Sequence, residues 1–194
     1  MQSNFFVLEG IDATGKSTVA KSLAQRGVRV VESPIRPFMG KQAVIERATP
    51  FANFLFFMAS NAQLASLVRE NTSTDAIVCV RYVWSSIAYH VALGGLTREE
   101  VSSFWKAFAH KFQIPGLAIF LSASDPERQR RFALKSEPVF QSGLQNNEVF
   151  QRRLKGEYSF ARKLVSWPSL DIDTTSEPPE VIVDQVLGLI GNRG

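Results

Sequence analysis

Short runs of apolar residues alternate along the chain with longer segments in which apolar residues recur at helical spacing. Most of these runs are apolar almost throughout, instead of at every second position, which is typical of a strand buried on both faces of a sheet. The runs are NFFVL, VRVV, AIVCV, GLAIFL and SLDI, at residues 4–8, 28–31, 76–80, 116–121 and 169–172. They predict a central parallel sheet of about five strands.

The segments between these runs predict amphipathic helices. The clearest extends from about residue 50 to 70, where Phe54, Met58 and Ala65 recur at helical spacing. Strands and helices in alternation predict an α/β fold of three layers, with helices on both faces of the sheet. Further helices are expected at residues 16–25, 101–112, 126–135, 146–164 and 179–190. Ligands bind such sheets at the carboxyl ends of the strands, so we expect function at the loops after residues 9, 31, 80 and 121.

The loop after the first run matches the P-loop pattern, Gly10-x-x-x-x-Gly15-Lys16-Ser17, between a predicted strand and a predicted helix. Its glycines let backbone N–H groups turn inward around phosphates, and the helix that follows contributes the positive end of its dipole. Lys16 adds a mobile cation, and the Ser17 hydroxyl is a candidate magnesium ligand. The pattern predicts a P-loop NTPase fold that binds ATP. The predicted ATP-binding residues of the loop are Gly10, Ile11, Asp12, Ala13, Thr14, Gly15, Lys16, Ser17 and Thr18.

NTPases, nucleoside kinases and nucleotide kinases share this loop and differ in the acceptor. The stretch VRYVWSSIAYH after the third run, together with FFVLEGIDATGKST, resembles the thymidylate kinase family of nucleoside monophosphate kinases. Three further segments are similar to the family in the same order: SPIRPFMGK, FFMASNAQ and VFQRRLKGEY. The resemblance implies transfer of the γ-phosphoryl group of ATP to a (deoxy)nucleoside monophosphate, with Mg²⁺ as cofactor and dTMP as the first candidate acceptor.

The acceptor phosphate calls for cations. A monophosphate is already a nucleophilic oxyanion, so it needs charge neutralisation more than a strong base. Arg36 and Arg81 each follow a predicted strand and could clamp the phosphate bidentately, the role that the resemblance assigns to them. A structural ion pair is the alternative for either arginine.

The resemblance also assigns the rest of the acceptor site. It makes Asp12 the acceptor of a hydrogen bond from the sugar 3′-hydroxyl, and it places Ser86 and Tyr89 in the base and sugar pocket. Phe57 corresponds to the aromatic residue that stacks on the base. Five phenylalanines lie between residues 38 and 57, so a core position for Phe57 is an equal alternative.

A basic helical face follows the fourth run. Arg128, Arg131 and Lys135 are spaced i, i+3 and i+7 and share one side of a helix. In the family, the lid that closes over ATP lies here, and this chain has Ala13 and Thr14 where some members carry an arginine in the P-loop. We therefore expect the lid, at about 128–146, to supply the cation, although a solvated basic face is the alternative. The predicted catalytic residues are Lys16, Arg81 and Arg131, and Arg128 is predicted to bind ATP.

Two departures from the family concern the metal. Val80 stands where the family has an aspartate that positions magnesium, and Ser122 stands where the fourth strand usually ends in aspartate. Magnesium prefers oxygen ligands, among them one or two carboxylates. We therefore predict Ser17 and Glu9 as metal ligands, with Asp12 as the other acidic candidate near the loop. The alternative is a metal held by Ser17, the phosphates and waters alone, and we expect slow catalysis.

A third departure concerns the base. Asn61 stands where the family places an arginine that hydrogen-bonds the thymine ring. Its amide offers both a donor and an acceptor and could read another base edge, so the identity of the base stays open.

Two other functions remain open. A deoxynucleoside kinase would need a general base, and Glu32, in VVESP, is placed where such kinases carry a carboxylate before a proline. The losses at Val80 and Ser122 would suit a catalytically weak nucleotide-binding protein, although the P-loop lysine and both acceptor arginines are retained.

Composition and charge indicate which partners and which cellular location to expect. The 194 residues carry a net charge of +4, and the basic residues are concentrated in a few segments, which favours small polyanions over nucleic acid as partners. No apolar run has the ~18 residues of a membrane span, and the lone Cys79 indicates a reduced thiol in a cytoplasmic protein. We expect a single P-loop kinase domain over residues 1–194. The resemblance and the apolar surplus around Phe51–Met58 and Phe104–Phe112 permit a homodimer.

Overall fold

The computed structural model describes residues 3–41, 45, 47–71, 75–134 and 147–191. Its centre is a parallel sheet of five strands in the order β2-β3-β1-β4-β5. The strands are β1 (Phe5–Glu9), β2 (Arg29–Glu32), β3 (Ile77–Val80), β4 (Leu117–Ser122) and β5 (Ser169–Asp173). The prediction of a three-layer α/β fold with five parallel strands is confirmed, and each apolar run forms a strand within one or two residues of the expected bounds.

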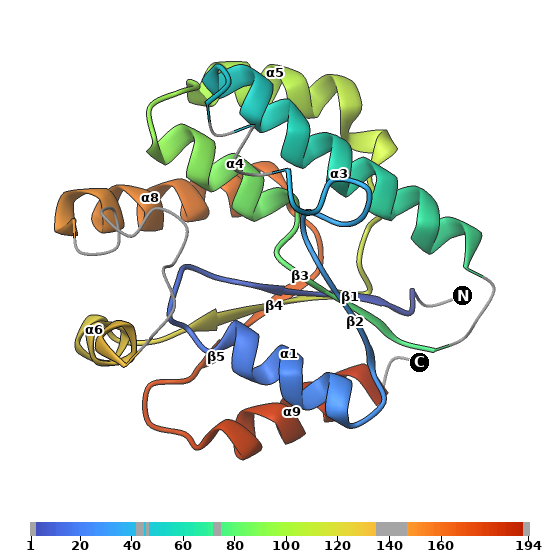
Figure 1. Cartoon of the computed structure of the whole chain (residues 1–194), viewed down its shortest axis with the longest axis vertical. Helices are drawn as coiled ribbons and strands as arrows, with labels where there is room; N and C mark the ends of the chain where they lie inside the picture. The colour runs from blue at the N-terminus through green and yellow to red at the C-terminus, as the bar shows by residue number, and fades with distance from the viewer. Residues whose placement is uncertain (1–2, 42–44, 46, 72–74, 135–146, 192–194) are drawn as a thin grey trace.

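Helices cover both faces of the sheet (Figure 1). One face carries α1 (Lys16–Gln25) and α9 (Pro179–Gly191). The other carries α3 (Pro50–Glu70), α4 (Val83–Ala92), α5 (Arg98–Phe108) and α8 (Glu148–Leu164). Successive side chains of a strand point to opposite faces. Accordingly Phe6 and Leu8 of β1 join the core beneath α1 and α9, while Phe5 and Val7 join the core beneath α3, α4 and α8.

Local signals set several helix ends. The Thr49 side chain accepts a hydrogen bond from the backbone N–H of Ala52, and Pro50 occupies the first turn of α3. A capping box between Thr97 and Glu100 starts α5 three residues before the predicted position. The predicted helix at 101–112 ends early because residues Ala109–Lys111 tighten into a 3₁₀ turn.

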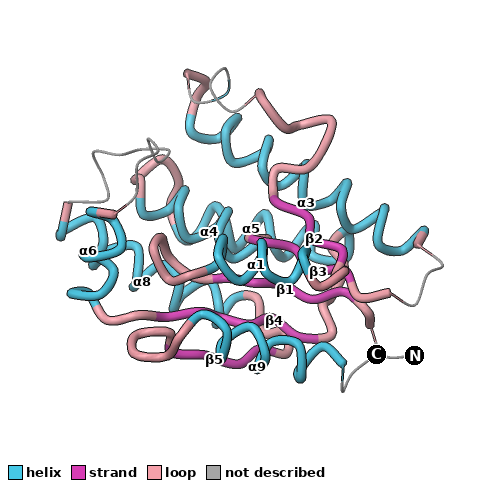
Figure 2. Tube along the Cα trace, turned by 60° about the horizontal axis from the view of Figure 1, so that its bottom comes forward, coloured by secondary structure: helices cyan, strands magenta, loops and turns pink. Residues whose placement is uncertain are grey.

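The basic segment after β4 forms α6 (Asp125–Ala133), which is separated from α8 along the chain. Figure 2 shows α6 near the N-terminal end of α8, at the side of the sheet where the strands end. Lys135 and most of the predicted lid lie outside the described residues.

Helix α3 is apolar far beyond the face that it buries. It is the one described helix that is long and apolar enough to cross a membrane, a test that core helices also pass, and 39% of its most apolar window is buried. Phe51 and Leu55 remain exposed, at 53% and 37%. Part of the apolar surplus predicted at Phe51–Met58 therefore lies at the surface of the chain, whereas Phe54 and Met58 are buried in the core.

Candidate active site

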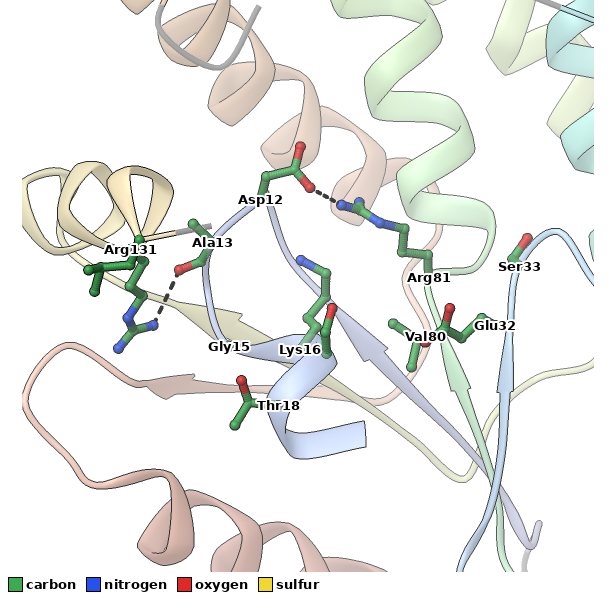
Figure 3. Close-up of a pocket in the computed structure, with 12 residues that line it drawn as sticks. Asp12, Ala13, Gly15, Lys16, Thr18, Glu32, Ser33, Val80, Arg81 and Arg131 are labelled. Atoms are coloured by element: carbon green, nitrogen blue, oxygen red, sulfur yellow. Dashed lines mark hydrogen bonds and ion pairs between the residues drawn. The ribbon is translucent and has the colours of Figure 1, made fainter. Parts of the chain in front are cut away.

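A pocket of about 370 Å³ opens at the carboxyl ends of β1, β2 and β3 (Figure 3). The P-loop forms one wall, the ends of β2 and β3 form the opposite wall, and α6 contributes at the rim. Its lining residues are Asp12, Ala13, Gly15, Lys16, Ser17, Thr18, Glu32, Ser33, Val80, Arg81, Arg131 and Leu134. The pocket thus lies at the carboxyl edge of the sheet, where the strand pattern predicted that ligands would bind.

The P-loop owes its shape to left-handed backbone. Gly15, with φ +94°, immediately precedes α1 and turns the N-terminus of that helix toward the pocket. Gly10 has φ +129°, and a Cβ atom there would overlap the backbone carbonyl oxygen of Leu121. Ala13 adopts φ +63°, a conformation rarely taken by a residue with a side chain. Thr14 is buried and donates to the carbonyl of Ile11 at 2.9 Å, which braces the loop from inside.

Lys16 reaches back over its own loop. Its Nζ donates to the carbonyl oxygen of Ile11 at 2.6 Å, and the side chain is 6% exposed. Figure 3 shows the ammonium group between the P-loop and the side chain of Arg81. Ser17 and Thr18 follow at the start of α1 and line the same pocket. The loop thus places backbone donors, an ammonium group and a hydroxyl around one space.

Arg81 faces the P-loop from the end of β3. It pairs with the Asp12 carboxylate, and its guanidinium lies over the ring of Tyr89, 5.2 Å from the centroid. Tyr89 in turn donates its hydroxyl to Asp12 at 2.7 Å. Burial raises the pKa of the Tyr89 phenol against the opposing effect of Arg81, so the hydroxyl stays protonated and available as a donor. Asp12, Arg81 and Tyr89 therefore form one group, with the guanidinium oriented from two sides.

Glu9 lies beneath the loop. It is fully buried and accepts hydrogen bonds from the backbone N–H of Tyr82 at 2.7 Å and of Ser85 at 3.2 Å, which caps the N-terminus of α4. The Ser85 hydroxyl and the Gly10 N–H donate to its other oxygen at 2.6 and 3.3 Å. Because both oxygens face protein donors and Glu9 does not line the pocket, these contacts favour a structural role over the predicted role as a magnesium ligand.

Tyr158 of α8 links this buried layer to the pocket, and sequence reasoning assigned it no role. Its hydroxyl lies 2.7 Å from the Ser85 hydroxyl, donates to the Gly10 carbonyl at 3.2 Å and accepts from Arg81 at 3.5 Å. Burial, and then the Glu9 carboxylate, raise the pKa of Tyr158, so its proton is retained. The only signal in the sequence was its place at the end of the segment VFQRRLKGEY.

Arg128 is tied to the loop instead of facing the pocket. It is 3% exposed, and its Nε donates to the backbone carbonyl of Asp12 at 2.8 Å. Its remaining donors reach Asp125 at 3.2 Å and Gln151 at 2.5 Å. In this arrangement Arg128 holds the P-loop against α6 and α8, and it does not line the pocket as a phosphate ligand would.

Arg131 lies at the rim of the pocket, half-buried (Figure 3). Its Nη1 donates to the Ala13 carbonyl at 3.2 Å, and two of its nitrogens contact Thr174 at 2.9 and 2.5 Å. Thr174, directly after β5, also donates to the Thr14 carbonyl at 3.1 Å. Sequence reasoning missed Thr174, whose position at a strand end was the only available signal. The pair holds the outer turn of the P-loop.

Asn61 and Ser86 lie together between α3 and α4. Asn61 is fully buried; its amide nitrogen donates to the Ser86 hydroxyl at 3.1 Å, and its oxygen accepts from the Ser33 hydroxyl at 2.9 Å. Ser33 follows β2 and lines the pocket. The network thus connects the loop after β2 to both helices, and the Asn61 amide is engaged by protein groups.

Phe57 of α3 is half-buried and is not among the residues that line the pocket. It packs edge-on against Phe56 and at a tilt against the ring of His90, with centroids 5.3 and 5.7 Å apart. Burial lowers the pKa of His90, so this aromatic group is uncharged near neutral pH. Arg36 is exposed and does not line the pocket, so the structure brings Arg81 to the P-loop but not Arg36.

Two carboxylates line the pocket among the described residues, Asp12 and Glu32. The described residues contain no group of three or more His, Cys, Asp or Glu that could hold a metal ion. A hydroxyl at Ser17 and carboxylate oxygens across the pocket form a hard donor set, which suits an ion that keeps several waters and the phosphates of its nucleotide.

Comparisons with known proteins identify relatives of this chain. The family model described as thymidylate kinase matches residues 8–163. A probable thymidylate kinase of Methanococcus maripaludis is 27% identical over 206 residues, covering 98% of this chain and 96% of the relative. One of Thermococcus kodakarensis is 28% identical over 207 residues, covering 96% of each.

Solved structures share the fold. The thymidylate kinase of Candida albicans aligns with a TM-score of 0.73 at 17% identity, over 98% of this chain and 92% of that chain. A deoxyadenosine kinase of M. mycoides aligns with a TM-score of 0.69 at 12% identity, over 96% and 99%. At these identities the structural likeness establishes the fold alone. The phosphate acceptor has to be inferred from the residues of the site.

Proposed function

The chain belongs to the thymidylate kinase family, and from that premise we propose that it transfers the γ-phosphoryl group of ATP to dTMP, giving dTDP and ADP. One observation carries the assignment: the P-loop, with Lys16, and the guanidinium of Arg81 face each other across a single pocket. That arrangement suits two phosphorylated ligands brought end to end.

The acceptor oxygen attacks the γ-phosphorus, the bond to the β-γ bridging oxygen breaks, and ADP leaves with the bonding electrons. The acceptor phosphate is already an anion, so the residues need to neutralise charge and align the reactants. Lys16 neutralises the donor phosphates, and Arg81 holds the acceptor phosphate. Asp12 and Tyr89 keep the guanidinium of Arg81 oriented, which lowers the cost of ordering it in the transition state.

The residues of the pocket fit a magnesium ion held with the nucleotide. We assign the Ser17 hydroxyl to it, together with a carboxylate of the pocket wall, and we do not assign Glu9. When bound, the ion neutralises charge that develops on the phosphate oxygens.

We further propose that Arg131 is the lid cation and that Arg128 is a positioning residue. The contacts of Arg131 with Ala13 and Thr174 support a place beside the donor phosphates. Those of Arg128 support control of the Asp12 backbone. The lid itself, at about 128–146, remains a prediction for its larger part.

For the acceptor nucleoside we propose stacking on Phe57 and contacts with Tyr89 and Ser86. Asn61 acts through its hydrogen bonds to Ser33 and Ser86, and the deep burial of its amide supports an indirect effect on base choice. Arg36 is exposed, and in this proposal it meets the acceptor only when the loop after β2 moves inward.

The remaining parts of the proposal concern the whole molecule. We propose one kinase domain over residues 1–194 and a cytoplasmic protein, supported by the buried free thiol of Cys79. We also propose a homodimer, supported by the exposed Phe51 and Leu55 of α3 and Phe108 of α5, which a second copy would cover. Small nucleotides are the expected ligands.

A deoxynucleoside kinase is the second candidate, because Glu32 lines the pocket and could act as a general base. A panel of acceptors separates the candidates. The purified full chain is incubated with ATP, Mg²⁺ and each of several nucleoside monophosphates and deoxynucleosides, and ADP release is measured. We expect turnover with dTMP and none with thymidine. Turnover with nucleosides alone would establish the second candidate, and none with any acceptor would leave a nucleotide-binding protein.

A further inference from the structure

We propose that Glu32 supplies, from the neighbouring strand, the carboxylate toward magnesium that this chain lacks at position 80. The inference rests on the proposed function, because it assigns a residue to the magnesium ion that accompanies ATP in the same site. It concerns donor binding alone, so it can be tested without knowledge of the acceptor.

The register of the sheet carries the first step. β2 and β3 pair in parallel, with Glu32 opposite Val80, and the backbone N–H of Ser33 donates to the Val80 carbonyl at 3.2 Å. Neighbouring strands lie about 4.8 Å apart. A carboxylate at position 32 therefore starts one strand spacing from position 80, and glutamate is one methylene longer than aspartate. Figure 3 shows the two side chains at the ends of their adjacent strands.

The pocket carries the second step. Glu32 lines the same space as Lys16 and Ser17, the residue to which the metal is assigned. The Glu32 carboxylate forms no hydrogen bond or ion pair with the described residues. Val80 is 7% exposed and lines the pocket with an apolar surface that offers no metal ligand. The oxygen donors that the two walls offer to a metal are thus the Ser17 hydroxyl on the P-loop side and the Glu32 carboxylate on the opposite side, both hard groups.

The third step is the engagement of the other acidic groups near the loop. Glu9 accepts five hydrogen bonds from backbone and hydroxyl donors beneath the loop. Asp12 pairs with Arg81 and accepts from Tyr89. Ser122, the other position where an aspartate is missing, does not line the pocket. Among the described residues, Glu32 is therefore the carboxylate of the pocket that is not already committed to holding a protein group.

Metal affinity is the direct test. Mn²⁺ replaces Mg²⁺ as a paramagnetic probe, and its binding to the full chain in the presence of ADP is followed by electron paramagnetic resonance. The affinity for ADP without metal is measured by calorimetry in EDTA. We expect Glu32→Gln to weaken Mn²⁺ binding in the ADP complex by about 10- to 100-fold, as for other residues that support a metal site. Affinity for metal-free ADP should not fall. Glu70→Gln, at an exposed site at the end of α3, is the matched control.

A second variant tests the relation between the two strands. Val80→Asp combined with Glu32→Gln returns the carboxylate to the β3 position, and we expect it to recover most of the lost Mn²⁺ affinity. Unchanged Mn²⁺ affinity in Glu32→Gln would overturn the inference. So would a loss of nucleoside turnover with unchanged Mn²⁺ affinity, since that result identifies a general base. If no monophosphate is turned over but Glu32→Gln still weakens Mn²⁺ binding, the proposed function fails and the assignment of Glu32 stands.

Discussion

The two walls of the pocket are built differently. The P-loop wall is one continuous stretch whose shape depends on left-handed backbone at Gly10, Ala13 and Gly15. The opposite wall shares this feature at Arg81, with φ +66° directly after β3, but it depends mainly on the Arg81 side chain, which Tyr89 of α4 supports from outside the pocket lining. A wall built from backbone groups withstands changes of side chain as long as the backbone conformation is kept. A wall built from a bound side chain is sensitive to any change in the functional group of that side chain. The walls should therefore respond to different kinds of substitution.

The largest effect is expected at Lys16, the P-loop side chain that we propose neutralises the donor phosphates. Lys16→Ala should lower kcat by about 10²- to 10³-fold, the cost of removing a preorganised donor from a developing negative charge. Steady-state ADP release measures the loss. Lys21→Ala on the exposed side of the same helix is the control and should leave kcat unchanged. Equal activity in both variants would contradict the role of Lys16.

The next effect tests the backbone of the same wall. Gly10→Ala places a Cβ atom against the Leu121 carbonyl at φ +129°, so both strain and overlap oppose it. We expect a loss of about 3 kcal/mol in the free energy of unfolding, measured by urea denaturation. Gly27→Ala is the matched control, with φ +84° but open space around the added atom, and should cost only about 1 kcal/mol. Equal losses would show that overlap at Gly10 is unimportant.

At the opposite wall, activity should fall even when a substitution keeps the charge and changes only the shape of the charged group. Arg81→Lys keeps the positive charge but removes the planar fork that pairs with Asp12 and lies over Tyr89. We expect kcat/KM for the monophosphate to fall by about 10- to 100-fold, consistent with the ~1.5–3 kcal/mol of a charged hydrogen bond. Arg29→Lys, exposed on β2, is the control. If Arg81→Lys kept the wild-type KM for the acceptor, the proposal that Arg81 binds the acceptor phosphate would be contradicted.

The smallest effect concerns the layer that joins the walls. Tyr158→Phe removes the hydroxyl that contacts Ser85, Gly10 and Arg81. We expect a loss of about 1–2 kcal/mol in the free energy of unfolding and a modest, several-fold fall in kcat. Tyr82→Phe is the control, because its buried hydroxyl accepts from the Gln113 backbone away from the pocket. It should cost similar stability and leave kcat unaffected; a matching fall in kcat would make the effect of Tyr158 merely structural.

Sequence reasoning succeeded where a pattern lies within one segment. The strands of the sheet and the helix at residues 50–70 follow from local periodicity, because apolar side chains in a regular element must share a face. It did not delimit α4, in which nine of ten residues are buried, because a helix that is apolar on all sides has no periodicity to detect. The contacts of Glu9, Arg128 and Thr174 were also invisible, since their partners are distant in the chain.

The sequence by itself determined the α/β alternation, the phosphate loop and the residues that could bear charge near it, because each depends on residue type and short spacing. Only the tertiary structure decided which charges reach the pocket. Glu9 is buried and its carboxylate accepts hydrogen bonds from protein groups, whereas Glu32 and Val80 lie opposite each other on adjacent strands. Burial and contacts between distant segments decide whether a charged side chain can bind a ligand. An ionised side chain that already accepts hydrogen bonds from the protein cannot also bind a ligand without losing those contacts.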